Sequence, residues 1–265
     1  MRLKDKIAIV VGAGQSSGEG LGNGRATVLR FAQEGAKVLA VDNKLASAEE
    51  TVAMAQPPGE CAAFAADVTE ETSLAEMVEA ARRRWGRIDI LHYNVGVSIA
   101  GGDAPLAEIT EAAFDRITTI NLRGAIMACK HVLPLMRAQR SGVIITISSV
   151  AALENYPYVA YKASKAGLIA FTQQVAVQNA AYGVRANVIL PGLMDTPMAV
   201  DTRARASGKS RAEVAAARDA RVPLRHKMGT AWDVANAALF LASDEANFIT
   251  GVALPVDGGT LAHIN

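Results

Sequence analysis

The chain has 265 residues, with 27 lysines and arginines against 26 aspartates and glutamates, so its formal net charge is only +1. This balance argues against a nucleic-acid-binding surface, which needs a clear excess of cations. The two cysteines, Cys61 and Cys129, are far apart in the sequence, which excludes a disulfide scaffold and a zinc site built from cysteine. Because 51% of the residues are hydrophobic and only 5% are aromatic, the core must be aliphatic.

No segment predicts a membrane span or a secretion signal. The apolar run at residues 7–11 follows a charged start and is too short for either, and residues 141–153 are too few to span a bilayer. We therefore expect a soluble, cytoplasmic protein with neither a membrane nor a nucleic-acid partner. No metal site is expected, because ligand spacing is lacking among the four histidines, His92, His131, His226 and His263.

Short β-branched runs alternate with amphipathic stretches along the chain, without repeats or linkers. The expected strands are residues 7–11, 37–41, 61–66, 88–93, 143–147, 184–190 and 252–256. The expected helices are residues 24–34, 45–56, 70–85, 111–140, 158–182 and 230–242. The strands are apolar without polar alternation, which is typical of a parallel sheet buried on both faces. We predict a single α/β domain over residues 1–265, with a doubly wound parallel sheet and helices on both faces.

Residues 198–228 fit no strand pattern and interrupt this alternation. We assign them as a small helical insertion, a lid over the carboxyl ends of the strands, where open α/β sheets bind ligands. The segment carries eight lysines and arginines against Asp201, Glu213 and Asp219. One interpretation is a lid that attracts an acidic substrate, and the other is a solvated helix face, since charge runs usually face water.

A glycine-rich turn follows the first expected strand and runs from Gly12 to Gly24. Glycines permit a tight turn and let a pyrophosphate approach the amides at a helix N-terminus, where the helix dipole favours negative charge. The position between a strand and an amphipathic helix makes this a stronger signal than an isolated glycine motif. The turn therefore predicts a dinucleotide site.

Asp42 closes the second expected strand. A carboxylate there accepts hydrogen bonds from the adenosine ribose hydroxyls and repels a 2′-phosphate. The glycine-rich turn contains no arginine or lysine to neutralise such a phosphate, and the only cation close to Asp42 in the sequence is Lys44, one residue beyond Asn43. This favours NAD over NADP. Asp67 and Val68, after the third strand, either lie at the adenine edge or cap a helix.

A second cluster follows the fifth expected strand. This strand ends in Ser148 and Ser149, and the next helix carries Tyr161 and Lys165 at positions i and i+4, which share one helix face. A lysine ammonium beside a phenol favours the phenolate, so we expect a tyrosine of lowered pKa that acts as general acid or base for a carbinol. A serine at the neighbouring strand end can hold the substrate oxygen.

Together these features resemble the short-chain dehydrogenases/reductases, a family of NAD(P)-dependent enzymes with a Rossmann-like fold. The resemblance covers nearly the whole chain. Besides the glycine-rich turn, it is carried by Asp67-Val68, Asn94 with Gly96, Asn121, Ser148-Ser149, Tyr161 with Lys165, Pro191-Gly192 with Thr196, and residues 254–259. These motifs are specific for the family but not for a substrate.

The resemblance implies roles for four catalytic residues. Tyr161 would give or take the substrate proton, and Ser149 would orient the substrate oxygen. Lys165 would bind the nicotinamide ribose and lower the pKa of the tyrosine. Asn121 would hold a water that links Lys165 to solvent.

The resemblance also implies a cofactor-binding set. Asn94 and Gly96 would shape the wall beside the adenosine ribose, and Thr196, with the main chain near Met194, would bind the carboxamide or phosphate side. The full set is Gly12, Gly22, Asn23, Gly24, Asp42, Asp67, Val68, Asn94, Gly96, Tyr161, Lys165, Met194 and Thr196.

Three features depart from the family pattern. Val11 replaces the threonine that usually precedes the first glycine. The glycine-rich turn is several residues longer than usual; we align its last glycines with Gly22 and Gly24, and the rival alignment uses residues 20–22. Ser149 lies one residue closer to the tyrosine than usual, and Ser148 would restore the spacing. We retain Ser149 because the strand-end pattern Ser-Ser-Val-Ala identifies the second serine.

We therefore expect an NAD-dependent oxidoreductase that interconverts a secondary alcohol, or a cyclic diol, and a ketone. The alternative is a redox-silent NAD-binding sensor or scaffold on the same fold, which needs no proton relay; a dehydratase or epimerase is least favoured. Residues 98–104, residues 153–158 and the lid determine the substrate, and Tyr156 and Tyr158 either line the pocket or pack within their loop. The family resemblance also implies a homotetramer.

Overall fold

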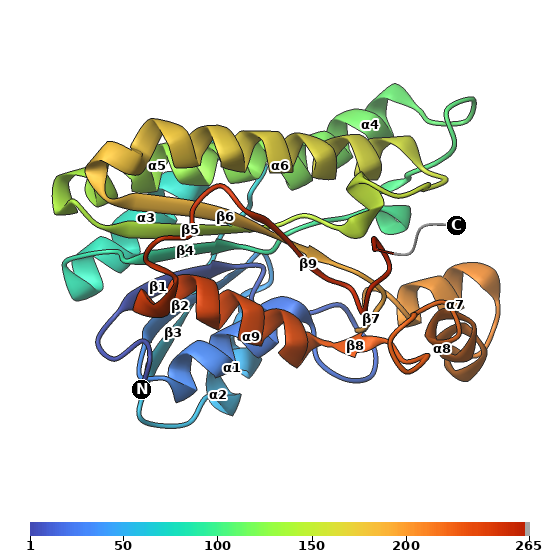
Figure 1. Ribbon diagram of the computed structural model, residues 1–265, viewed down its shortest axis with the longest axis horizontal. Coiled ribbons are helices and arrows are strands. Elements are labelled where there is room, and N and C mark those ends of the chain that lie inside the picture. Colours follow the sequence, from blue (N-terminus) through green and yellow to red (C-terminus); the bar gives the residue numbers. More distant parts are fainter. Residues whose placement is uncertain (263–265) are drawn as a thin grey trace.

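Seven parallel strands form one twisted sheet in the order β3-β2-β1-β4-β5-β6-β9 (Figure 1). This computed structural model describes residues 1–262, so His263 lies outside the described residues. The strands are β1 (Ile7–Val11), β2 (Lys37–Asp42), β3 (Glu60–Ala65), β4 (Ile90–Tyr93), β5 (Gly142–Ile147), β6 (Val184–Pro191) and β9 (Ala253–Val256). The strand order reverses between β1 and β4, and ligands bind beyond the carboxyl ends of strands at such a reversal.

Helices cover both faces of the sheet, which confirms the predicted fold class. In Figure 1, α1, α2 and α9 lie on one side of the sheet and α3, α5 and α6 on the other. The bounds are α1 (Asn23–Gln33), α2 (Leu45–Met54), α3 (Glu71–Trp85), α4 (Glu111–Thr118), α5 (Gly124–Gln139), α6 (Val159–Asn179), α7 (Asp201–Ser207), α8 (Arg211–Asp219) and α9 (Ala231–Ala242). None of the helices within residues 1–262 combines the length and apolar character that crossing a bilayer requires.

The core is divided into two layers by the sheet. Successive strand residues point to opposite faces. Ala8 and Val10 of β1 therefore pack in a cluster with α1 and α9, whereas Ile9 and Val11 pack in a cluster with α3 and α5. Since β1 is buried on both faces, it needs no polar alternation, and this explains the continuous apolar runs in the sequence.

The expected helix at residues 111–140 contains an irregularity that its sequence pattern did not indicate. A π turn, Thr119–Arg123, joins α4 to α5 and includes Asn121. Such turns insert an extra residue into the helix and occur frequently at functional sites. A two-stranded ribbon, β7 (Met194–Asp195) with β8 (Gly229–Thr230), was also not predicted, because strands of two residues show no periodicity.

Residues 198–228 form the predicted helical insertion. Its two helices, α7 and α8, lie beside the carboxyl ends of the strands, at the right of Figure 1. The β7–β8 ribbon closes the base of this insertion, which we call the lid.

The long glycine-rich turn delivers the chain into α1. Gly12 has a positive φ of 81°, and a Cβ at Gly24 would overlap the carbonyl oxygen of Gly12. Helix α1 begins at Asn23 with Gly22 as its N-cap. Only glycine permits this approach between the turn and the helix, so the geometry favours the alignment on Gly22 and Gly24 over residues 20–22.

Candidate active site

A cavity of about 730 Å³ lies between the carboxyl ends of the strands and the lid. Each residue of the predicted cofactor-binding set lines it, as does Ser149. Of the predicted catalytic residues, Asn121 is the one that is not part of its lining within the described chain. The fold thus brings together segments from β1, β2, β4, β5, α6 and the lid, which are far apart in the sequence.

Main-chain and side-chain hydrogen bonds hold the end of the cavity near the glycine-rich turn. One carboxylate oxygen of Asp42 accepts from the Gly14 amide at 3.0 Å, and the other accepts from the Lys44 amide at 3.0 Å. Asn94 donates its side-chain amide to the carbonyl of Gly12 at 3.2 Å. These bonds tie the turn to the ends of β2 and β4.

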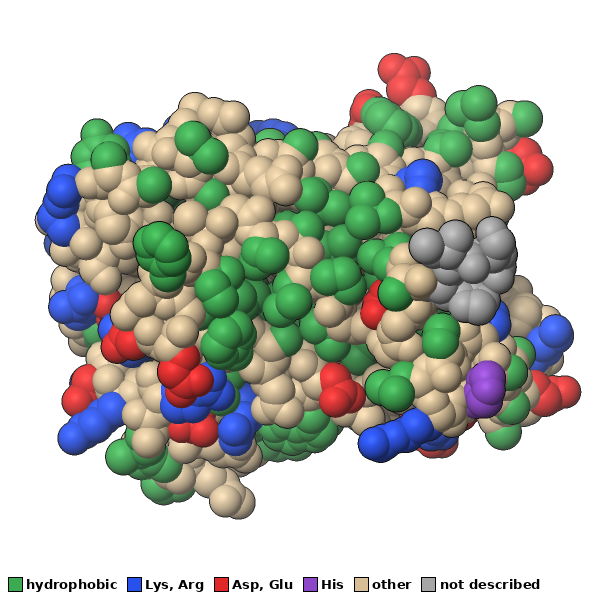
Figure 2. Space-filling model, viewed as in Figure 1, with side chains coloured by type: hydrophobic (Ala, Val, Ile, Leu, Met, Phe, Trp, Pro, Cys, Tyr) green, Lys and Arg blue, Asp and Glu red, His purple; other side chains and the backbone are tan. Residues whose placement is uncertain are grey.

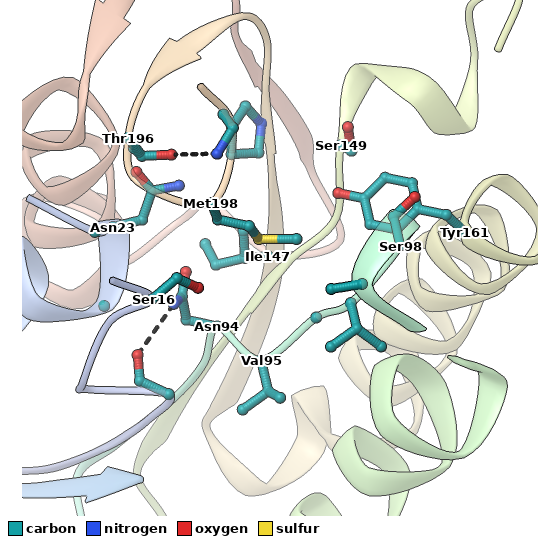
Figure 3. Close-up of a pocket in the computed structure, with 18 of the residues that line it drawn as sticks. Ser16, Asn23, Asn94, Val95, Ser98, Ile147, Ser149, Tyr161, Thr196 and Met198 are labelled. Carbon is teal, nitrogen blue, oxygen red and sulfur yellow. Dashed lines mark hydrogen bonds between the residues drawn. The ribbon is translucent and has the colours of Figure 1, made fainter. Parts of the chain in front are cut away.

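Two features of this end fit a dinucleotide. Asn23 Oδ1 is buried and has no hydrogen-bond partner among residues 1–262, so it is an acceptor ready for a donor in the cavity. Figure 3 shows Asn23, Asn94 and Ser16 on the side of the pocket opposite Tyr161. A buried acceptor beside a close-packed glycine turn at a helix N-terminus is suited to a bound cofactor.

Arg25 lies directly after the glycine-rich turn, but its charge is already paired. The guanidinium donates to Thr51 Oγ1 at 2.9 Å and to Glu50 at 2.9 Å, and it is buried. Since its donors are engaged within the protein, it is not placed to neutralise a 2′-phosphate. Asp42 therefore keeps its carboxylate in the cavity lining without an arginine partner there.

At the other end of the cavity, Ser149 and Tyr161 lie near each other (Figure 3), and the Ser149 hydroxyl accepts from the Ala151 amide at 3.2 Å. Ser148 is different: it is buried and donates its hydroxyl to the main-chain carbonyl of Lys165 at 2.7 Å. The chain after β5 therefore directs the second serine of the pair toward the tyrosine. Lys165 Nζ donates to the carbonyl of Ile147 at 2.7 Å and lies 5.7 Å from the Tyr161 ring centre.

The pKa values of the tyrosine and the lysine are displaced by burial. Burial raises the pKa of Tyr161 to about 12, opposed by its hydrogen bond with Ser149, and burial lowers the pKa of Lys165 to about 7. The expectation of a lowered tyrosine pKa is therefore not met by the chain's own residues. The reason is that burial of the phenol, the largest effect, outweighs the opposing effects of Ser149 and Arg203, and Lys165 directs its Nζ at the Ile147 carbonyl.

Asn121 is fully buried and uses its side chain inside the protein. Its Oδ1 accepts from the Val97 amide at 2.8 Å, and its Nδ2 donates to the Val97 carbonyl at 2.9 Å and to Ser164 Oγ at 3.0 Å. These bonds hold the segment after β4, including Gly96, where a Cβ would come within 3.0 Å of Lys165 Nζ. The expected role of Asn121 in holding a water that links Lys165 to solvent stays a prediction.

Asp103 is a site residue that the sequence did not reveal. One carboxylate oxygen accepts from the Ala160 amide at 3.0 Å, and the other accepts from the Tyr161 amide at 3.1 Å and from Ser98 Oγ at 3.0 Å. These amides belong to the first turn of α6, where helical N–H groups lack partners. Tyr158, the residue before α6, supplies no side-chain cap. A tyrosine at this position was the only sign in the sequence that another segment must cap the helix.

The loop before α6 contributes one tyrosine to the cavity lining. Tyr156 lines the cavity with its ring centre 5.6 Å from that of Tyr161, and its hydroxyl lies 3.2 Å from Ser98 Oγ. Tyr158 packs edge-on against Tyr156 and is outside the cavity lining of the described chain. His226 is exposed on the lid, and no group of three or more potential metal ligands occurs within residues 1–262.

Four of the eight basic residues of the lid show two different environments. Arg211 pairs with Asp195 at 2.6 Å and with Asp201 at 3.4 Å, and Lys227 pairs with Asp219 at 2.7 Å. In contrast, two lid arginines line the cavity itself, namely Arg203 and Arg218. The expectation of a merely solvated basic face therefore fails for these two residues.

Comparisons with known proteins agree with the fold. A family model described as enoyl-(acyl carrier protein) reductase matches residues 18–260. The chain belongs to the short-chain dehydrogenase/reductase family. This is a family of oxidoreductases that use NAD(P).

Three similar proteins match nearly end to end. The 3-oxoacyl-(acyl-carrier-protein) reductase of Thermotoga maritima is 35% identical over 263 residues, covering 98% of this chain and 99% of that protein. The cis-4-hydroxycyclohexanecarboxylate dehydrogenase of Sinomonas cyclohexanicum is 36% identical over 261 residues, covering 97% of each. A solved structure of a Burkholderia xenovorans protein assigned to the family has a TM-score of 0.93 and 42% identity, covering 100% of this chain and 99% of that one.

Proposed function

We propose that this short-chain dehydrogenase/reductase is an NAD-dependent enzyme that interconverts a secondary alcohol, or a cyclic diol, and a ketone. The single observation that carries the proposal is the convergence of Ser149, Tyr161 and Lys165 on the cavity that the glycine-rich turn also lines. Two hydroxyl groups beside a buried amine can position a carbinol oxygen and exchange a proton with it. A relative named for oxidising a hydroxycyclohexanecarboxylate supports an alcohol substrate.

The side chains divide the work between them. A bound nicotinamide cofactor would supply or accept the hydride, which is chemistry of the cofactor. Tyr161 donates its hydroxyl proton to the carbonyl oxygen during reduction and takes it back during oxidation. Ser149 donates a hydrogen bond to the same substrate oxygen and fixes its position. Lys165, held by Ile147, binds the cofactor ribose, and Asn121 acts as a positioning residue behind Gly96.

NAD is the proposed cofactor, and NADP is less favoured. Asp42 lines the cavity after β2, where its carboxylate accepts from ribose hydroxyls and repels a 2′-phosphate. Arg25, the cation closest in sequence to the turn, is paired with Glu50. We propose the remaining cofactor contacts for the other residues of the predicted set, since all of them line the same cavity.

Replacing Tyr161 by phenylalanine tests the proposed chemistry. Tyr161→Phe keeps the ring and removes the proton, so turnover of a secondary-alcohol panel should fall about 10²–10⁴-fold, the usual contribution of a general acid or base. NADH binding, followed by the fluorescence of the reduced nicotinamide, should remain. The same titration with NADPH should show weaker binding to the wild-type protein.

The outcomes separate the two candidate functions. Unimpaired turnover in Tyr161→Phe would remove the tyrosine from the proton-transfer role. If the wild-type protein binds NADH tightly but turns over no alcohol or ketone, the redox-silent sensor is the better description. Stronger binding of NADPH than of NADH would overturn the proposal that Asp42 selects NAD by repelling a 2′-phosphate.

We also propose a cytoplasmic homotetramer, built from one dinucleotide-binding domain per chain with the lid at residues 198–228. An exposed apolar surface supports this assembly: hydrophobic side chains gather over β9, between α6 and α9 (Figure 2). Strand β9 is an edge of the sheet, and Phe248 just before it is fully exposed. Exposed apolar surface over an edge strand is typical of an interface between copies.

A further inference from the structure

We propose that Arg203 and Arg218 form an anion-binding subsite that selects hydroxy acids and keto acids, with the substrate carboxylate bound away from the reacting carbon. This inference rests on the proposed oxidoreductase function and assigns its substrate class. Both arginines line the catalytic cavity, and they come from different helices of the lid, α7 and α8. The lid thus contributes two arginines to the lining of the catalytic cavity.

Arg218 is a buried cation that forms no direct ion pair within residues 1–262, and the charge of Asp195 acts on it only from a distance. Only 8% of the residue is exposed, and its single hydrogen bond is a weak one from Nε to the sulfur of Met228 at 3.4 Å. No carboxylate in residues 1–262 lies within 4 Å of it. Burying an ionised group without a partner is strongly unfavourable, so a protein retains one chiefly where something else supplies the missing charge.

Arg203 lies near the catalytic end of the same cavity. Its Nη1 donates to the Ala199 carbonyl at 2.9 Å, and no carboxylate of the described chain is within ion-pair distance. Its positive charge acts to lower the pKa values of Tyr156 and Tyr161, against the larger effect of burial, and all three residues line the same cavity. An anion held by Arg203 would therefore leave the rest of the substrate beside the Tyr161 hydroxyl.

The two arginines also oppose each other. Burial lowers the pKa of Arg218 to about 10, and the neighbouring charges of Arg203 and Arg221 add to the decrease. A carboxylate between the two guanidinium groups would offset both the desolvation and the mutual repulsion. The nearby carboxylates are already paired: Asp195 of β7, whose charge partly offsets the decrease in the pKa of Arg218, pairs with Arg211, and Asp219 of the lid pairs with Lys227.

Guanidinium groups match a carboxylate in shape as well as charge. Arginine donates from a planar fork, which permits two parallel charge-assisted hydrogen bonds to one carboxylate. One substrate thus needs a carbinol carbon at Ser149 and Tyr161 and a carboxylate at the lid, joined by a short chain or ring. This also explains the excess positive charge of the lid where it faces the cavity.

Matched substrates test the subsite. 3-Hydroxybutyrate, 4-hydroxypentanoate and 5-hydroxyhexanoate would each be compared with the corresponding methyl ester, which keeps the carbinol and removes the charge. The wild-type protein should prefer at least one acid. In Arg203→Met and in Arg218→Met, the KM of that acid should rise about 10- to 100-fold, as expected for loss of a hydrogen bond to a charged group. The KM and kcat of the ester should change little.

A control variant distinguishes the subsite from general attraction by the lid. Lys209 is exposed, belongs to the lid and does not line the cavity, so Lys209→Met removes the same charge without touching the subsite. It should leave the KM of the acid within about 3-fold of the wild-type value in buffered salt, because exposed charges are screened. If all three substitutions raise the KM of the acid equally, long-range electrostatic attraction, and not a subsite, explains the preference for acids.

Thermal melting supplies a readout that is independent of turnover. Because Arg218 is buried and unpaired, Arg218→Met should keep or raise the Tm of the protein without substrate, whereas a purely structural arginine would lower it. The preferred acid, added with NAD, should raise the Tm of the wild type more than that of either arginine variant. If the wild-type protein turns over acids and esters with equal KM, the subsite is overturned and the proposed function stands. If it turns over neither acids nor esters, the proposed function itself is overturned.

Discussion

His92 in β4 shows how a single buried side chain can make stability depend on pH. It is fully buried, neither ring nitrogen has a partner among the described residues, and its ring packs edge-on against Phe31. Burial lowers its pKa from 6.5 to about 3, so the imidazole remains neutral in the folded protein. In the unfolded chain it takes up a proton near its ordinary pKa. The folded state therefore loses stability as the pH falls from 6.5 toward 3.

We predict that His92→Leu removes this acid sensitivity. At pH 7 the variant should be as stable as the wild type or more stable by about 1 kcal/mol, because an unsatisfied buried polar group is replaced by an apolar one. Urea titrations at pH 7 and at pH 5 measure the free energy of unfolding. Its decrease from pH 7 to pH 5 should be smaller in the variant than in the wild type. A parallel fall in both proteins would show that other groups control the acid response.

At the scale of elements, the unusually long glycine-rich turn contacts the lid. The amide of Glu19 donates to Asp201 Oδ1 at 3.2 Å, and Arg205 donates to the carbonyl of Ser17 at 3.2 Å. Arg211 of α8 lies 3.4 Å from Asp201 and 3.7 Å from the Glu19 carboxylate. The additional residues of the turn thus join the cofactor side of the cavity to the substrate side.

We predict that breaking this junction weakens cofactor binding. Asp201→Ala removes the acceptor of the Glu19 amide and one partner of Arg211, so the turn should become more mobile and the Kd for NADH should rise about 3- to 10-fold. Fluorescence titration measures the change. Glu213→Ala is the control, since it removes the capping box of α8 without touching the turn. An equal loss in both variants would attribute the effect to lid stability rather than to the junction.

At the scale of the whole molecule, the apolar surface over β9 bears on assembly. The edge strand is half-buried, and Val177 of α6 and Phe248 are largely or fully exposed. We expect four copies to cover this surface and the exposed faces of α5 and α6. Light scattering should therefore report four chain masses at micromolar concentration. A single chain mass would contradict the proposed tetramer and leave the apolar face unexplained.

The sequence by itself determined the alternation of strands and helices, because periodicity and burial on both faces of a sheet leave a direct pattern in β1 and its neighbours. It also determined that the glycine-rich turn leads into a helix, and that Tyr161 and Lys165 share one helix face. These are local properties, in which residues close in sequence are also close in space. The family followed from the same local motifs and their order.

Only the tertiary structure decided which distant side chains meet. Asp103 caps α6 although more than fifty residues separate it in sequence from the Ala160 amide that it accepts from. No local sequence pattern marks this contact. The direction of Ser149 rather than Ser148 toward the tyrosine depends on how the chain leaves β5. The pKa of Tyr161 is raised rather than lowered because the fold buries the phenol, and Lys165 directs its Nζ at the carbonyl of Ile147. Burial, and with it the position of Arg218 in the cavity, arises from all elements packing together.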